Sequence, residues 1–296
     1  MGLAGALAET LILPLARRSA LLRELVAYIH DRVGRDGAGE LRERFVSNGR
    51  HSQWTQEIRG EIADRFAEIH RQVDIHSGQS DALIMAEAVL SLDADGDLVE
   101  CGCYAGGSTA KLSILAKLLG KRLFVFDSFE GFPPATLEDR GDIHTRYTRR
   151  FNWDAGAANA PLAVVKQNVQ AVGELSACVF IPGWFRDTMT RDNLPAKVCF
   201  AYTDVALPSS TKDAFTALWP LLTERGVYFS RDVGFVKVLQ QLMDEQMWRE
   251  LDEFPPVLFG GGYGIRNAAP NLGFMVKGKS VSAEYINSLT INKVTS

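Results

Sequence analysis

Short runs of β-forming residues alternate with segments of helical length through most of the chain, and this alternation constrains the fold more than any other feature. The runs lie at 98–101, 123–126, 178–181, 198–202 and 227–229. The segments between and after them, at 108–119, 162–172, 210–222 and 236–251, are long enough to cross a sheet as helices. This pattern predicts an α/β fold with a doubly wound, mostly parallel sheet.

The end of the chain breaks the alternation. Two apolar runs, 257–259 and 272–276, have no helical segment between them, so they are predicted to pair as an antiparallel hairpin that closes the sheet edge. Glycines from Gly260 to Gly264 then form the hairpin loop, because no helix start follows them to cradle a phosphate. Ser210 and Asp213 indicate a capping box at the start of one crossover helix.

Apolar residues at helical spacing fill the front of the chain. They predict helices over 22–33, 58–73 and 82–92. Residues 1–95 are therefore expected to form a helical cap and oligomerisation region, in front of a core at 96–296. The alternative for the apolar stripes is simple core packing.

Composition excludes several classes of protein. At 46% apolar residues and a net charge of −4, the chain is neither disordered nor basic enough to bind nucleic acid through a global positive field. The apolar stretch at 2–16 is interrupted by Glu9 and is too short to span a membrane, so a cytoplasmic protein without a membrane partner is expected. The four cysteines are expected to be reduced, and Cys101 and Cys103 lack the second pair that a zinc site needs.

A glycine-rich turn follows the first predicted strand. Its Gly-x-x-x-Gly-Gly spacing differs from the dinucleotide motif, which disfavours a nicotinamide cofactor. Glu100 at the strand end suits a cationic ligand, and Asp127 at the next strand end lies where doubly wound folds bind ribose hydroxyls. Together they predict S-adenosylmethionine as cofactor; the alternative is that both acids are merely solvated strand ends. The turn supplies the further cofactor-binding candidates Gly102, Tyr104, Gly106 and Ser108.

Three segments carry a family resemblance: residues 97–102 (DLVECG), 127–133 (DSFEGFP) and 182–188 (PGWFRDT). With 165–169 and 209–212, they resemble the macrocin/mycinamicin O-methyltransferases of antibiotic biosynthesis. The resemblance implies a class I, Rossmann-like methyltransferase, a homo-oligomer such as a homodimer, and methyl transfer to a hydroxyl of a sugar or related natural product. It also implies cofactor contacts for Ser128 and for Trp184, which would border the adenine.

Catalytic candidates lie at strand ends and in a long insertion at about 134–160, which is predicted to be a lid. Asp204 follows the fourth strand and is also a cofactor-binding candidate. Within the insertion, His144 offers an imidazole that could accept a hydroxyl proton, and the alternative is a solvated loop histidine. The nearby arginines either attract an anionic acceptor or solvate the loop; they are Arg140, Arg146, Arg149 and Arg150.

Metal dependence is doubtful. The resemblance implies carboxylates after the fourth and fifth strands that hold magnesium. This chain keeps Asp204 and Asp232 there, but it has Ala206 and Arg231 at positions where the family commonly has aspartates. We therefore expect Arg231 to replace the metal and to stabilise the acceptor oxygen; the alternative is a structural ion pair.

Three other functions stay open at this point. The same fold serves N-methyltransferases. The altered acidic positions are compatible with a cofactor-binding protein that has lost methyl transfer. A dinucleotide oxidoreductase is the third alternative, although the glycine spacing argues against it.

Overall fold

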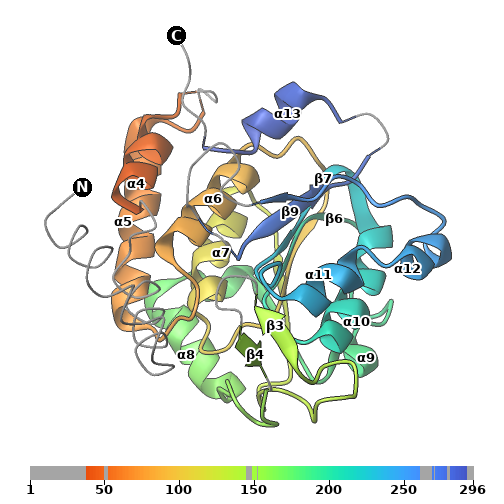
Figure 1. The fold of residues 1–296 in the computed structure, drawn as a ribbon. Coiled ribbons are helices and arrows are strands. Elements are labelled where there is room, and N and C mark those ends of the chain that lie inside the picture. The colour runs from red at the N-terminus through yellow and green to blue at the C-terminus, as the bar shows by residue number, and fades with distance from the viewer. Residues whose placement is uncertain are drawn as a thin grey trace, which may run out of the picture.

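The computed structural model describes residues 38–49, 53–144, 149–151, 153–260, 269, 271–278 and 281–291. A seven-stranded sheet forms its centre, in the order β5-β2-β1-β6-β7-β9-β8 (Figure 1). The strands are β1 (Asp97–Cys101), β2 (Leu123–Asp127), β5 (Cys178–Pro182), β6 (Val198–Thr203), β7 (Leu222–Ser230), β8 (Phe259–Gly260) and β9 (Gly273–Val276). The helix predicted over 22–33 and most of the glycine loop lie outside the described residues.

Strand pairing confirms the predicted α/β fold. β1 pairs in parallel with both β2 and β6, and β5 and β7 extend the parallel sheet on either side. β9 pairs antiparallel with β7 and with β8, which is the predicted hairpin, with β9 inserted next to the parallel strands. The strand order reverses between β1 and β6, and this switch point opens a crevice beyond the carboxyl ends of the strands.

Helices cover both faces of the sheet. One side carries α4 to α8, and the other carries α9 to α12, as Figure 1 shows. Their bounds are α4 (Ala38–Ser47), α5 (Gln56–Gln72), α6 (Gln79–Leu90), α7 (Gly107–Leu118), α8 (Leu162–Val172), α9 (Phe185–Thr188), α10 (Pro208–Leu218), α11 (Val236–Leu242), α12 (Glu245–Glu250) and α13 (Ala283–Ser288).

Two helix predictions are corrected. The expected capping box at Ser210 is wrong, because α10 already begins at Pro208, whose fixed φ suits the first helical position. The single helix expected over 236–251 is two helices. It breaks at Met243, and the side chain of Asp244 starts α12 by accepting a hydrogen bond from the Met247 N–H at 2.7 Å.

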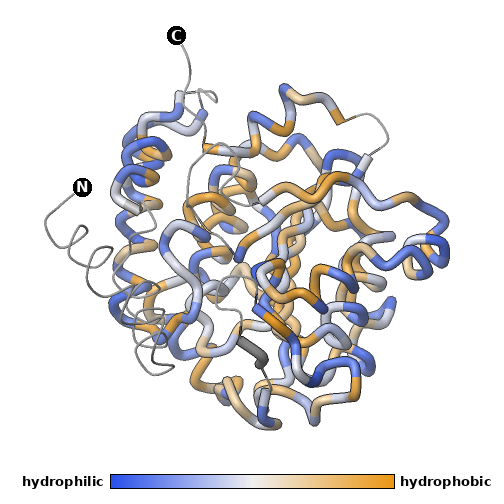
Figure 2. The backbone as a smooth tube through the Cα atoms, viewed as in Figure 1, coloured by the Kyte–Doolittle hydropathy of each residue, from blue (hydrophilic) through white to orange (hydrophobic). Residues whose placement is uncertain are grey.

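Alternation along each strand divides the core into two layers. On β1, Leu98 joins the cluster under α4 to α8, whereas Val99 and Cys101 join the cluster under α10 to α12. Figure 2 shows the central strands as mostly hydrophobic and the outer helices as mixed. Helices α4 to α6 therefore share a hydrophobic core with the sheet. None of the helices within the described ranges is long and apolar enough to cross a membrane.

The insertion at 134–160, here called the lid insertion, is anchored to α10 and α11. Its described part contains a two-stranded antiparallel sheet, β3 (Asp142–His144) with β4 (Arg149–Phe151). Asp139 accepts hydrogen bonds from the backbone N–H and the hydroxyl of Ser209, at 3.0 and 2.9 Å. The Lys237 ammonium donates to two carbonyls of the insertion at 2.7 Å.

A buried lysine on α7 gives a stability prediction. Among the described residues, no hydrogen-bond acceptor reaches the Lys111 ammonium, and burial lowers its pKa from 10.5 to about 8. Below pH 8 the folded protein therefore holds a buried cation, and stability rises with pH between 8 and 10.5 because the unfolded chain binds more protons there. We expect Lys111→Met to stabilise the protein at pH 7 by on the order of 2 kcal/mol.

Urea denaturation at pH 7 and pH 10.5 measures this effect. The gain should shrink at the higher pH, where the wild-type lysine is neutral in the folded protein and about half neutral in the unfolded chain. Lys117→Met, at an exposed position of the same helix, should change stability little at either pH. An equal gain for Lys111→Met at both pH values would contradict the explanation.

Candidate active site

A cavity of about 1070 Å³ opens at the carboxyl ends of the parallel strands. It exceeds the ~300–1,000 Å³ typical of a site for one small ligand. Ten residues predicted from the sequence line it together: Gly102, Tyr104, Ser108, Asp127, Ser128, His144, Trp184, Asp204, Arg231 and Asp232. Residues from the strand ends, the lid insertion and the loop before α6 thus surround one space.

The glycine-rich turn depends on its glycines. Gly102 has φ +82°, and a Cβ there would lie 2.2 Å from the Asp204 carbonyl oxygen. Gly106, with φ +87°, is the N-cap of α7 but does not line the cavity. The turn thus brings the ends of β1 and β6 into direct backbone contact, which a side chain would prevent.

Asp127 organises the adjacent strand end. Its Oδ2 accepts a hydrogen bond from the Cys103 N–H at 2.7 Å, and its Oδ1 accepts one from the Phe129 N–H at 2.7 Å. Each carboxylate oxygen keeps lone-pair capacity for a further donor. The Ser128 hydroxyl donates to the Gly131 carbonyl at 2.8 Å, so it shapes the same turn.

Glu100 lies behind the cavity wall. Its side chain is fully buried, and its Oε2 accepts a hydrogen bond from the Thr109 hydroxyl of α7 at 2.6 Å. Burial raises its pKa to about 8, so at pH 7 the group is mostly the neutral acid. The sequence placed Glu100 against a cationic ligand, whereas the structure places it among residues that support the turn.

A loop that sequence reasoning missed covers the glycine-rich turn. Residues 73–78, here called the cap loop, connect α5 to α6. The Tyr104 hydroxyl donates to Asp74 Oδ2 at 2.8 Å, and the rings of Tyr104 and His76 stack with centroids 4.4 Å apart. No sequence motif indicates the role of this loop, because its contacts are with a residue about 30 positions later in the chain, Tyr104.

Trp184 borders the cavity near Asp127. It is the N-cap of α9, directly after β5. The Gly183 N–H donates to the Asp127 carbonyl at 2.9 Å, which fixes the two strand ends side by side. An aromatic ring and a carboxylate therefore stand at the same edge of the cavity.

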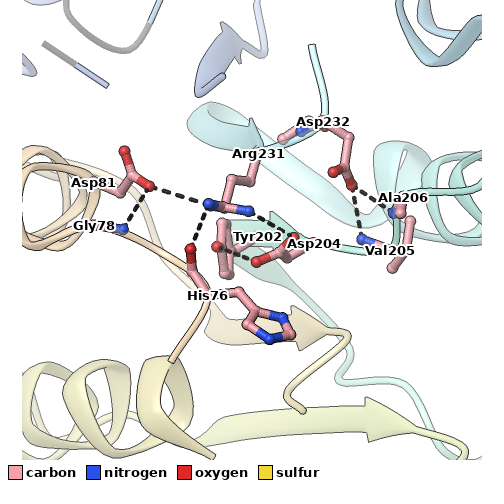
Figure 3. Close-up of polar contacts among 10 residues, drawn as sticks. His76, Gly78, Asp81, Tyr202, Asp204, Val205, Ala206, Arg231 and Asp232 are labelled. Carbon is pink, nitrogen blue, oxygen red and sulfur yellow. Dashed lines mark hydrogen bonds and ion pairs between the residues drawn. The ribbon is translucent and has the colours of Figure 1, made fainter. Parts of the chain in front are cut away.

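Three charged residues form the centre drawn in Figure 3. The Arg231 guanidinium lies between Asp81 of α6 and Asp204, with Nε donating to Asp81 Oδ2 at 3.2 Å and Nη1 lying 3.6 Å from Asp204 Oδ1. Nη2 donates to the His76 carbonyl at 2.6 Å. The Tyr202 hydroxyl donates to Asp204 Oδ2 at 3.2 Å.

Asp232 is directed away from this cluster. Its Oδ2 accepts hydrogen bonds from the backbone N–H groups of Val205 and Ala206, both at 2.8 Å. Burial first, and then the charge of Asp204, raises its pKa. Asp232 thus holds the turn after β6, where Ala206 adopts φ +57°.

His144 is buried rather than solvated, so the alternative of a solvated loop histidine is wrong. It lies on β3 and contacts Phe235 edge to face, with ring centroids 4.8 Å apart. A Cβ on Gly234 would lie 2.8 Å from its Nε2, so the ring packs against that glycine. Trp153, which sequence reasoning left without a role, lines the same wall and contacts Phe132 and Phe235.

A sequence model of the macrocin O-methyltransferase family (TylF) matches residues 81–255, which is more than half of the chain. The chain belongs to the macrocin O-methyltransferase family. The family resemblance of the three sequence segments is confirmed. This is a family of O-methyltransferases, and the matched range includes Asp81 and every strand-end residue of the cavity.

Curated relatives agree with this family. The 8-demethyl-8-(2,3-dimethoxy-alpha-L-rhamnosyl)-tetracenomycin-C 4'-O-methyltransferase of Streptomyces olivaceus is 35% identical over 144 residues, covering 47% of this chain and 54% of the relative. The demethyldecarbamoylnovobiocin O-methyltransferase of Streptomyces niveus is 28% identical, covering 69% and 77%. The chain thus spans about half the length of the first relative.

A solved structure of the O-methyltransferase NovP superposes with a TM-score of 0.57 at 19% identity, covering 69% of this chain and 82% of that one. At this identity the superposition shows the fold alone. It confirms the Rossmann-like methyltransferase architecture that the sequence predicted.

Proposed function

We propose that this protein is an S-adenosylmethionine-dependent O-methyltransferase that methylates a hydroxyl of a sugar or other small natural product. The observation that carries the proposal is the large cavity at the switch point, bounded by the glycine-rich turn and Asp127, in a member of an O-methyltransferase family. The names of the relatives support the acceptor class, because one acts on a rhamnosyl 4' position and another on mycinamicin III.

The cavity residues fit the cofactor. A Cβ at Gly102 would clash with the Asp204 backbone and so displace the glycine-rich turn. Asp127 keeps acceptor capacity for a ribose diol, and Trp184 offers a ring to the adenine. When bound, S-adenosylmethionine supplies a methyl group activated by a positively charged sulfur, which keeps the electron pair of the broken C–S bond. The chain must then align the acceptor hydroxyl and remove its proton as the O–CH₃ bond forms.

We assign proton removal to His144. It lines the cavity from the lid insertion and belongs to the aromatic wall of Trp153 and Phe235. A neutral imidazole accepts a proton readily near pH 7. The lid insertion closes the acceptor side of the cavity in this proposal, because Thr136, His144 and Trp153 all line it.

His144→Ala should lower kcat by about 10²- to 10⁴-fold, because general base catalysis contributes about that much. Binding of S-adenosylhomocysteine should be unchanged, and His144→Gln, which cannot take the proton, should not restore the rate. Ile143→Ala, at the exposed neighbouring position of β3, is the matched control and should have wild-type kcat. Wild-type turnover in His144→Ala would exclude the histidine as base.

Calorimetry with S-adenosylmethionine and S-adenosylhomocysteine, followed by mass analysis of acceptors, tests the function. We expect binding of both cofactors and a gain of one methyl group on glycosides with a free sugar hydroxyl. No binding at millimolar cofactor would refute the cofactor assignment. Binding without transfer would favour the non-catalytic protein, and transfer only to amino sugars would favour an N-methyltransferase.

We further propose a homo-oligomer, for which the family resemblance is the support and a homodimer the simplest form. We also propose a cytoplasmic location, on the ground of the short, interrupted apolar stretch at 2–16. Light scattering on the purified protein tests the assembly. A monomer at assay concentration would refute it.

A further inference from the structure

The strand ends where the family resemblance implies a magnesium site do not fit a divalent metal in this chain. Asp204 faces the guanidinium of Arg231 at 3.6 Å. Asp232 is turned away from Asp204, with one oxygen engaged by two backbone N–H groups. Within the described residues, no group of three or more His, Cys, Asp or Glu side chains could hold an ion.

Arg231 is held in place from two sides besides Asp204. Asp81, in the first turn of α6, accepts its Nε–H at 3.2 Å, and the His76 carbonyl of the cap loop accepts from Nη2 at 2.6 Å. Asp81 is itself fixed, because it also accepts the Gly78 N–H at 3.2 Å. The guanidinium therefore cannot swing away without breaking contacts to two separate segments.

One edge of the guanidinium stays available. Nη1 makes only the longer, 3.6 Å approach to Asp204, so its two N–H groups can still donate to a ligand in the cavity that Arg231 lines. Asp204 lies beside it and also lines the cavity. A hydroxyl placed there would meet a permanent positive charge and a carboxylate together.

We propose that Arg231 is a built-in cation that takes the place of the family's divalent metal, that its Nη1 binds the reacting oxygen of the acceptor, and that Asp81 is its positioning residue. This rests on the proposed function, because the reacting oxygen is the hydroxyl that receives the methyl group. As that hydroxyl loses its proton to the base, negative charge develops on the oxygen and the guanidinium stabilises it. Arginine suits this role because it stays protonated throughout.

The arrangement also explains why a metal is excluded. A dication bound by Asp204 would stand within a few ångströms of the guanidinium, and like charges repel strongly in a partly buried site. Replacing the arginine by an acid would remove this repulsion and place a third carboxylate between Asp81 and Asp204. Arg231→Asp should therefore create the metal site that the wild-type chain lacks.

The experiment titrates Mn²⁺ into wild-type protein and into Arg231→Asp, and follows free Mn²⁺ by electron paramagnetic resonance. We expect the wild-type Kd for Mn²⁺ to lie above about 1 mM and the Kd of the variant to be at least about tenfold lower. Arg191→Asp makes the same charge change at an exposed position outside the cavity and should bind like wild type. Binding of S-adenosylhomocysteine reports whether each variant is folded.

Turnover supplies the second measurement. Wild-type methyl transfer should be unaffected by excess EDTA, and Arg231→Gln should lose at least tenfold in kcat with no rescue by Mg²⁺. Asp81→Asn should lower kcat with little change in the KM for cofactor, and Asp81→Glu should restore part of it. If Asp81 and Arg231 formed only a structural ion pair, Asp81→Asn would instead lower the stability of the protein without lowering kcat relative to KM.

Tight Mn²⁺ binding by the wild type, or EDTA-inhibited turnover restored by Mg²⁺, would overturn the proposal. If Arg231→Asp fails to fold, the Mn²⁺ titration of the wild type and the kcat of Arg231→Gln still test the proposal. Absence of methyl transfer with every acceptor would refute the proposed function, while the Mn²⁺ titration would still show whether the wild-type site excludes a metal.

Discussion

Asp127→Ala is expected to weaken binding of S-adenosylhomocysteine by about a hundredfold, measured by calorimetry. The substitution removes the carboxylate that would accept two hydrogen bonds from the ribose diol. Each bond should contribute ~1.5–3 kcal/mol, and the lower end of that range, at about tenfold in affinity per 1.4 kcal/mol, corresponds to the hundredfold loss. It also removes the acceptor of the Cys103 and Phe129 N–H groups, through which Asp127 holds the turns after β1 and β2 together.

Two control variants distinguish an effect on cofactor binding from an effect on the folded structure. Asp97→Ala alters the opposite end of β1, where the carboxylate pairs with Arg122 at 2.9 Å, and should leave affinity unchanged. Asp127→Asn keeps one acceptor oxygen but faces the second N–H with an amide, so an intermediate loss is expected. Unchanged affinity in Asp127→Ala would mean that the ribose binds elsewhere.

The part of the cavity at the ends of β1 and β2 was predictable because local sequence encodes it. Strand ends followed by glycine or an acid place Gly102 and Asp127 at one edge of a parallel sheet once the strand alternation is recognised. The structure confirms that both line the cavity. Glu100 lies on β1 just before the same turn, but the sequence could not reveal that its side chain points toward α7.

The charged centre was only half predictable. Arg231 and Asp204 stand at recognisable strand ends, whereas Asp81 reaches Arg231 across 150 residues of sequence. Nothing in the spacing of α6 distinguishes Asp81 from an ordinary acid in a first helical turn. Contacts of this kind depend on how whole elements pack, and a single sequence does not encode them locally.

The alternative of a solvated loop histidine at His144 is wrong for a related reason. His144 is buried because β3 packs against α11 and Phe235. Residues distant in the sequence, such as Lys237, hydrogen-bond to the lid insertion and hold it against the core. These tertiary contacts could not be read from the charged residues around His144.

Removing either partner of the Arg59–Glu87 ion pair is expected to have the largest effect on stability. Both side chains are 0% exposed, with Arg59 Nη1 donating to Glu87 at 2.7 Å. Arg59 also donates to the Phe45 and Trp54 carbonyls, and Ser91 donates to Glu87. The pair joins α5 to α6 and reaches the end of α4, so Arg59→Met or Glu87→Leu should cost about 3–5 kcal/mol by leaving a buried charge unpaired.

The double variant decides between the energy of the pair and the penalty of an unpaired charge. Arg59→Met with Glu87→Leu removes both charges, so urea denaturation should show far less destabilisation than the sum of the single variants, although the Phe45 and Trp54 carbonyls lose their donor. Additive losses would instead mean that each side chain acts through its own packing. Because α6 also carries Asp81, the single variants should loosen the hold on Arg231, which links the stability of the front helices to the charged centre of the cavity.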